Sequence, residues 1–237
     1  MNRRFFKFPH TPHLVWLGKK PPREDKVLSE EEAQALLEGE VVVEEKVDGA
    51  IVSLSLDEEG RMRVQGRGEY LGRGEHPQFD PLWPWMESRR PSLTKALRPG
   101  LVLSGEWCFA VHSVRYARLP DWFLGFDVYD PGQDRFWSTE RRDRLLGEIG
   151  IARVPEIARG RCTIESLCRL LGTSRVGVEP MEGLYVRREH GNWLDCRAKI
   201  VRPEFAQSIE EHWALRPLEK NSLAQHGHRT AIAEKRC

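Results

Sequence analysis

Short β-branched runs joined by tight turns are the feature that most constrains the fold of this chain. VVVEEKV and AIVSLSL are separated only by Asp48 and Gly49, and the turn DEEG leads from the second run into RMRVQG. Further along, GLYVRRE and NWLDCRAKIV lie around the turn HGN. Strands joined by turns of a few residues pair in antiparallel fashion. The pattern therefore predicts an antiparallel sheet.

Helical signals lie between and after these runs. In LSEEEAQALLEG, Ser29 and Glu32 form a capping box and Gly39 ends the helix. STERRDRLLGEIG and TIESLCRLLG predict two more short helices, and Pro203 opens a last one, PEFAQSIEEHW. We expect a mobile loop in the Gly- and Pro-rich stretch 66–85 and loose order from Asn221 onward.

Together these signals predict an α+β fold with a single domain. Residues 1–205 form the domain, and residues 206–237 form a short C-terminal helical tail with too few residues for an independent core.

Composition narrows the class of protein. The formal net charge of +1 does not indicate a polyanionic partner. Any nucleic acid must therefore bind a local basic surface. The N-terminus MNRRFFKFPH has no apolar run behind its basic residues, and no apolar run is long enough to span a bilayer. The five cysteines show no CxxC pair, which predicts reduced thiols in a cytoplasmic protein with no zinc site.

Charged residues stand at the ends of several predicted strands. Lys46 ends VVVEEK and begins KVDG, Glu106 ends LVLSGE, and Glu182 precedes GLYV. Arg197 and Lys199 alternate on one strand, so their side chains share a face. Each residue alone also fits an ordinary role, because a single KxDG string occurs by chance at turns and strand-end carboxylates are commonly solvated.

The ordered set resembles the covalent nucleotidyltransferase superfamily of polynucleotide ligases and mRNA capping enzymes. KVDG is similar to motif I of that superfamily, LSGEW to motif III, FLGFDVYD to motif IIIa, EGLYV to motif IV and RAKIV to motif V. AKIVRPEF and the short chain look most like the phage-type RNA ligase 2 group. The resemblance covers roughly residues 40 to 205 and implies the antiparallel-sheet nucleotidyltransferase fold.

The resemblance implies an ATP-dependent RNA ligase. Lys46 would attack ATP to form a lysyl-AMP, pass the AMP to a 5′-phosphate end, and allow a 3′-hydroxyl to seal the strand. Glu182 would hold Mg²⁺ or Mn²⁺, and Lys199 would share the catalytic work. The nucleotide-binding residues implied are Glu45, Arg67, Glu106, Phe126 and Arg197.

One departure concerns Arg197, where many relatives have a lysine. Arginine keeps the charge and offers a planar fork to a phosphate, but it is a poor proton donor, so an acid role falls to Lys199. The expected partner is RNA with 3′-hydroxyl and 5′-phosphate ends, with an end-healing kinase as a candidate second partner and no membrane. The alternatives are a DNA ligase, a capping-type nucleotidyltransferase, or an inactive ligase-like RNA-binding protein. Phe126 also fits simple core packing.

Overall fold

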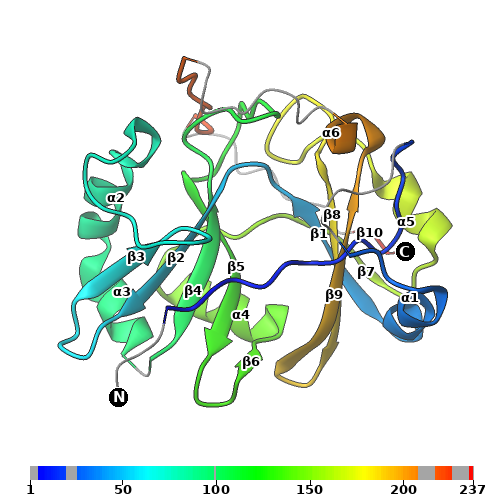
Figure 1. Cartoon of the computed structure of the whole chain (residues 1–237), viewed down its shortest axis with the longest axis horizontal. Helices are drawn as coiled ribbons and strands as arrows, with labels where there is room; N and C mark the ends of the chain where they lie inside the picture. Colours follow the sequence, from blue (N-terminus) through cyan, green and yellow to red (C-terminus); the bar gives the residue numbers. More distant parts are fainter. Residues whose placement is uncertain (1–4, 20–25, 99, 208–216, 226–234, 237) are drawn as a thin grey trace.

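The computed structural model describes residues 5–19, 26–98, 100–207, 217–225 and 235–236. Within them the strands form two five-stranded sheets that lie beside one another (Figure 1). Every strand pair is antiparallel except β7 with β10, which confirms the predicted mixed fold with antiparallel sheets.

Strand order brings segments far apart in the sequence together. The first sheet has the order β10-β7-β1-β8-β9, and the second has the order β3-β2-β4-β5-β6. The strands of the first sheet are β1 (Val41–Lys46), β7 (Glu156–Gly160), β8 (Gly183–His190), β9 (Trp193–Val201) and β10 (Lys235–Arg236). The strands of the second sheet are β2 (Ala50–Leu56), β3 (Met62–Gln65), β4 (Val102–Trp107), β5 (Phe123–Asp130) and β6 (Arg135–Phe136).

The KVDG turn carries the chain from one sheet to the other. β1 ends at Lys46 in the first sheet, and β2 begins at Ala50 in the second. Gly49 is required there by close approach, because a Cβ at this position would lie 2.6 Å from the carbonyl oxygen of Trp107. Lys46 therefore lies where the two sheets meet.

Helices cover the outer sides of the two sheets (Figure 1). α1 and α5 bury apolar residues against the first sheet, and α2 and α3 do the same against the second. The capping box at Ser29 is present as predicted. The helical elements are α1 (Glu30–Leu37), η1 (Pro77–Phe79), α2 (Leu82–Ser88), α3 (Arg90–Leu97), α4 (Thr139–Glu148), α5 (Ile164–Leu170) and α6 (Pro203–Gln207).

The predicted loop over 66–85 is wrong for its last part. Residues from Leu82 onward form α2, in which Leu82, Trp85 and Met86 are buried. Pro81 stands at the N-cap and Pro84 lies in the first turn, where a missing N–H breaks no helical hydrogen bond. Burial of the apolar side chains outweighs the loop-like composition.

The N-terminal segment crosses both sheets (Figure 1). The backbone of Lys199 donates to the carbonyl of Pro12, and the backbone of Leu14 donates to the carbonyl of Lys199, each at 2.8 Å. At the second sheet, the side-chain amide of Gln65 donates to the carbonyl of Phe6. The segment thus ties β9 to β3.

The end of the chain departs from two expectations. The predicted last helix is described only over α6, since residues 208–216 lie outside the described residues. Loose order is wrong for residues 221–225, because Asn221 is buried and this stretch bonds to the backbone of residues 108–119.

The cysteines also depart from expectation at one position. Cys162 is disulfide-bonded, so the prediction that all five are reduced thiols is wrong there. Spacing along a sequence does not report which thiols meet in the fold. Cys108, Cys168 and Cys196 are free, and Cys237 lies outside the described residues. None of the described helices has the length and apolar character needed to cross a bilayer.

Candidate active site

Lys46 and Glu182 form an ion pair at the junction of the sheets. Lys46 is paired across the strands with Gly183, which places Glu182 beside it, and its Nζ lies 2.6 Å from Oε2 of Glu182. Burial alone would lower the pKa of Lys46, but the charges of Glu182, Tyr185 and Glu106 outweigh burial and raise it above its ordinary value. The amine is therefore held as an ammonium in this state.

Two carboxylates, Glu182 and Glu106, act on the charge of this lysine. Burial raises the pKa of Glu106 to about 8. The charge of Lys46 opposes this shift, and the charges of Asp48 and Glu182 add to it. Burial also raises the pKa of Glu182, against the charges of Lys46 and Lys199. The site therefore concentrates negative charge around one amine.

The raised pKa of Glu106 predicts how the free energy of unfolding changes with pH. Its pKa of about 8 in the folded protein exceeds the ordinary 4.5, so the folded state binds more protons than the unfolded state between those values. We expect this carboxyl to lower the free energy of unfolding as pH rises through that window. Glu106→Gln should flatten the fall in urea unfolding experiments performed across the window, and identical pH slopes in the two proteins would contradict the assignment.

Asp48 holds a loop of the second sheet against the KVDG turn. Its Oδ2 accepts hydrogen bonds from the backbone of Ser113 at 2.5 Å and of Val114 at 3.0 Å. Its own backbone N–H donates to the hydroxyl of Tyr116 at 2.7 Å. The contact between Asp48 and Tyr116 spans 68 residues, so no local pattern in the sequence predicted it.

Glu45 lies on the other face of β1 from Lys46. Its side chain is fully buried, and Oε2 accepts from the backbone of Arg175 at 2.8 Å. Burial raises the pKa of Glu45, against hydrogen bonds from Ser174 and Arg175. The structure does not bring this carboxylate to the amine of Lys46.

Phe126 and Arg197 lie beneath the N-terminal segment. Phe126 is 8% exposed and packs edge-on against Phe8, with ring centroids 5.4 Å apart. The guanidinium of Arg197 lies 4.7 Å from the Phe8 ring centroid and forms an ion pair with Asp127. Arg67 is exposed in the loop after β3, away from these buried contacts.

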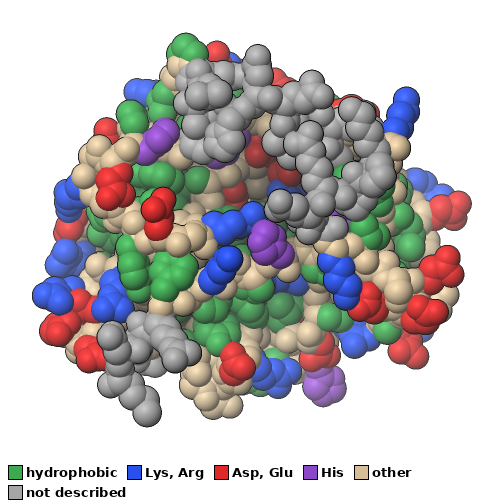
Figure 2. Space-filling view, viewed as in Figure 1, with side chains coloured by type: hydrophobic (Ala, Val, Ile, Leu, Met, Phe, Trp, Pro, Cys, Tyr) green, Lys and Arg blue, Asp and Glu red, His purple; other side chains and the backbone are tan. Residues whose placement is uncertain are grey.

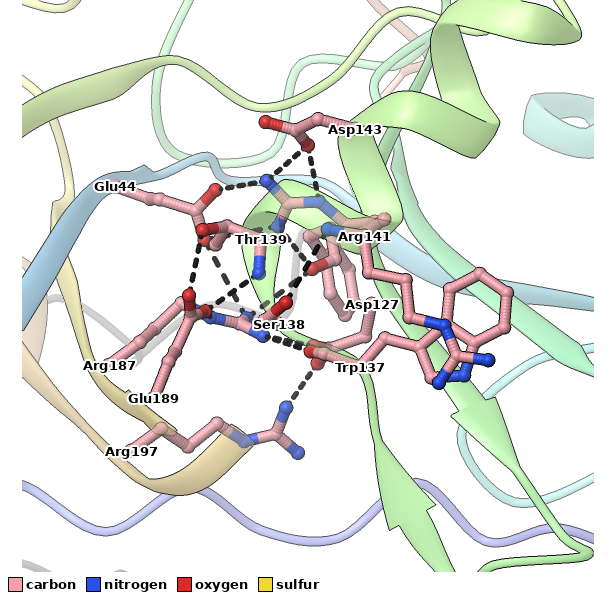
Figure 3. Close-up of polar contacts among 12 residues, drawn as sticks. Glu44, Asp127, Trp137, Ser138, Thr139, Arg141, Asp143, Arg187, Glu189 and Arg197 are labelled. Carbon is pink, nitrogen blue, oxygen red and sulfur yellow. Dashed lines mark hydrogen bonds and ion pairs between the residues drawn. The ribbon is translucent and has the colours of Figure 1, made fainter. Parts of the chain in front are cut away.

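A buried ionic network connects the two sheets beside the site (Figure 3). Arg142 of α4 lies 2.6 Å from Oε1 of Glu44, and Arg187 of β8 lies 2.8 Å from Oδ1 of Asp127. Glu44 is two residues from Lys46 on the same face of β1, and Asp127 follows Phe126 on β5. The signal that sequence reasoning missed was a set of charges inside otherwise apolar strand runs.

The donor set fits a hydrated divalent cation. Among the described residues, no group of three or more His, Cys, Asp or Glu side chains forms a ready-made metal site. Mg²⁺ usually keeps several waters and binds one or two carboxylates together with substrate phosphates. Glu182 and Glu106 offer carboxylates of that kind, and burial is the main cause of the raised pKa of both.

Basic side chains also gather on this side of the molecule. Figure 2 shows Lys, Arg and His side chains at the middle of the face that the N-terminal segment crosses. A formal net charge of +1 hides this local concentration.

Comparison with models of protein families identifies the family of this chain. The model described as RNA ligase matches residues 39–201, which is more than half of the chain. This chain belongs to the RNA ligase family. The matched range contains every predicted site residue from Glu45 to Lys199. No curated protein matches the chain.

Solved structures show that this RNA ligase family member has the fold of an RNA ligase. An alanine variant of Naegleria gruberi RNA ligase with ATP and Mn is 19% identical, with a TM-score of 0.61, over 84% of this chain and 63% of that chain. The same ligase with pyrophosphate is 19% identical, with a TM-score of 0.61, over 86% of this chain and 64% of that chain. This family member thus spans less than two thirds of the Naegleria chains.

Proposed function

We propose that this protein is an ATP-dependent RNA ligase that carries AMP on Lys46. The observation that carries the proposal is the partly buried Lys46–Glu182 pair at the junction of the sheets, in a chain matched by the RNA ligase family. The similar Naegleria gruberi ligase was solved with ATP and Mn, with pyrophosphate, and with AMP and Mn. Those ligands are the substrate, the leaving product and the transferred group of such a reaction.

The first step joins Lys46 to the nucleotide. The Nζ lone pair attacks the α-phosphorus, the bond to the β-phosphate oxygen breaks, and pyrophosphate leaves with that electron pair. The ammonium must lose a proton first, and the nearest acceptor is Oε2 of Glu182, 2.6 Å away. Negative charge on the phosphoryl oxygens favours nearby cations, a role for Lys199.

The next two steps move the AMP to RNA and seal the strand. An oxygen of the 5′-phosphate attacks the phosphorus of lysyl-AMP, and the bond to Nζ breaks, which returns the amine to Lys46. A 3′-hydroxyl then attacks the 5′-phosphorus, loses its proton, and displaces AMP. A divalent cation bound at Glu182 would supply charge neutralisation to these phosphoryl oxygens.

The remaining residues take supporting roles in this proposal. Phe126 is the adenine platform in this proposal, which requires Phe8 to move away from its ring. Arg67 and Arg197 meet phosphates, and Glu106 meets the nucleotide ribose. To bind a phosphate, Arg197 must give up its ion pair with Asp127. Otherwise it acts indirectly, by fixing the position of β9. Glu45 holds the end of β1 from the face opposite Lys46, because its carboxylate accepts a hydrogen bond from the backbone N–H of Arg175.

We also propose a subgroup, a cellular location, domain bounds and a substrate for this protein. We place the protein in the phage-type RNA ligase 2-like group, in the cytoplasm, with residues 1–205 as the adenylylating domain. Its substrate is RNA with 3′-hydroxyl and 5′-phosphate ends, and an end-healing kinase would prepare broken RNA for it.

Two assays test the function. The protein is incubated with Mg²⁺ and α-labelled ATP or GTP, and we expect a labelled protein band with ATP alone. It is then given duplexes with a single nick in RNA or in DNA, and we expect sealing of the RNA nick. A band with GTP would favour a capping-type enzyme, sealing of DNA alone would favour a DNA ligase, and no band with either nucleotide would overturn the enzyme assignment.

A further inference from the structure

Asn221 is a buried polar side chain that the site residues do not explain. It is 4% exposed, and its side chain makes three hydrogen bonds, all to backbone groups of one loop. Oδ1 accepts from the backbone of Tyr116 at 2.7 Å. Nδ2 donates to the carbonyl of Cys108 at 2.9 Å and to that of Ala110 at 3.0 Å.

An asparagine is specifically suited to this position. The loop presents one backbone donor and two backbone acceptors to a single side chain, so the side chain must both accept and donate. A carboxylate of the same shape accepts but does not donate, and an alanine does neither. Loss of these bonds would leave buried backbone groups unpaired, which is costly.

The segment around Asn221 also forms backbone hydrogen bonds with the same loop. The backbone of Val111 donates to Glu219, that of Asn221 to Phe109, and that of Ser222 to Tyr116. Leu119 donates to Ser222 and accepts from Ala224 through the backbone. Residues 219–224 therefore fix both sides of the 108–119 loop.

That loop in turn holds the turn that carries Lys46. Tyr116, whose backbone N–H is bound by Asn221, accepts from the backbone of Asp48 through its hydroxyl. Ser113 and Val114 of the same loop donate to the Asp48 carboxylate. Tyr116 is fully buried, so its ring has little freedom to compensate for a displaced backbone.

We propose that Asn221 is a positioning residue, which acts through the 108–116 loop and Asp48 to hold the KVDG turn, and with it Lys46, in place. Residues 219–224 lie beyond the proposed 1–205 domain but are thus part of the architecture of the adenylylation site. The catalytic meaning of this inference rests on the proposed function, whereas the ordering of the loop can be measured without it.

The first test compares Asn221→Ala with Ser222→Ala. Ser222 is exposed and uses only its backbone in the loop, so it controls for the tail itself. At saturating ATP, we expect Asn221→Ala to slow single-turnover labelling about ten- to a hundredfold, because a displacement near 1 Å costs about a hundredfold. Ser222→Ala should stay within about twofold. Equal rates for both variants, with both proteins folded by thermal melting, would overturn the proposal.

A double-mutant cycle separates positioning from general stability. Tyr116→Phe removes the hydroxyl that accepts from Asp48, so it breaks the same path farther along. If Asn221 acts through that path, the double variant should be little slower than the slower single variant. Additive losses would contradict the path. Should Asn221→Ala not fold, Asn221→Asp, which keeps the acceptor for Tyr116, serves in its place.

Hydrogen exchange distinguishes failure of the inference from failure of the proposed function. Asn221→Ala should speed amide exchange at residues 108–116 relative to the wild-type chain and Ser222→Ala. If the wild-type protein takes no label at all, the proposed function fails while faster exchange still supports the loop anchor. Unchanged exchange in this loop would overturn the anchor whether or not the protein is labelled.

Discussion

Replacing Glu182 with glutamine is expected to slow AMP transfer to Lys46 by at least about a hundredfold, in the range lost when a general acid or base is removed. Glutamine keeps the shape of the side chain but loses the charge that holds Nζ at 2.6 Å. It also loses the carboxylate that would accept a proton and bind a divalent cation. The measurement is the single-turnover rate of protein labelling with α-labelled ATP.

Glu148→Gln is the matched control for this change. Glu148 is an exposed carboxylate at the end of α4, and its replacement should leave the labelling rate unchanged. A labelling rate for Glu182→Gln within about threefold of wild type, in folded protein, would contradict the proposed role of Glu182.

Arg142→Met is expected to lower the free energy of unfolding by about 3–5 kcal/mol, which is typical when one partner of a buried ion pair is removed. Arg142 is 1% exposed and lies within 3.2 Å of both carboxylate oxygens of Glu44. It also donates to the carbonyl of Phe126 at 2.6 Å. The substitution leaves Glu44 buried with only Arg187, 3.6 Å away, as a partner. Urea unfolding measures the loss.

Arg144→Met on the same helix is the control for Arg142→Met. Arg144 is exposed and pairs with Glu140 one turn away, a pair worth about 0.3–0.5 kcal/mol. Adding Glu44→Gln to Arg142→Met should cost less than the sum of the two single changes, because the unpaired charge is then gone. Similar losses for Arg142→Met and Arg144→Met would show that the network does not hold the sheets together.

Local structure was largely predictable from the sequence. The capping box at Ser29 and the hairpin that turns at Gly191 depend on residues close to one another, so their patterns are readable directly. The order of motifs from Lys46 to Lys199 predicted the family that the family model confirms. Their roles in the chemistry stay predictions.

Long-range arrangement was not predictable in the same way. The runs on either side of Asp48 pair in different sheets, and no local signal distinguishes a turn within a sheet from one between sheets. Asn221 contacts Cys108 across 113 residues, and Arg142 contacts Glu44 across 98. Such polar contacts follow from how the sheets pack, which one sequence alone does not reveal.

The adduct itself tests the central claim most directly. Wild-type protein and Lys46→Arg are incubated with ATP and Mg²⁺, digested, and mapped by mass spectrometry. Arginine keeps the positive charge beside Glu182, but it is not deprotonated in proteins and so cannot act as the nucleophile. We expect one adenylyl group on Lys46 in the wild-type protein and none in Lys46→Arg. An adenylyl group on another residue, or equal labelling of Lys46→Arg, would contradict the account.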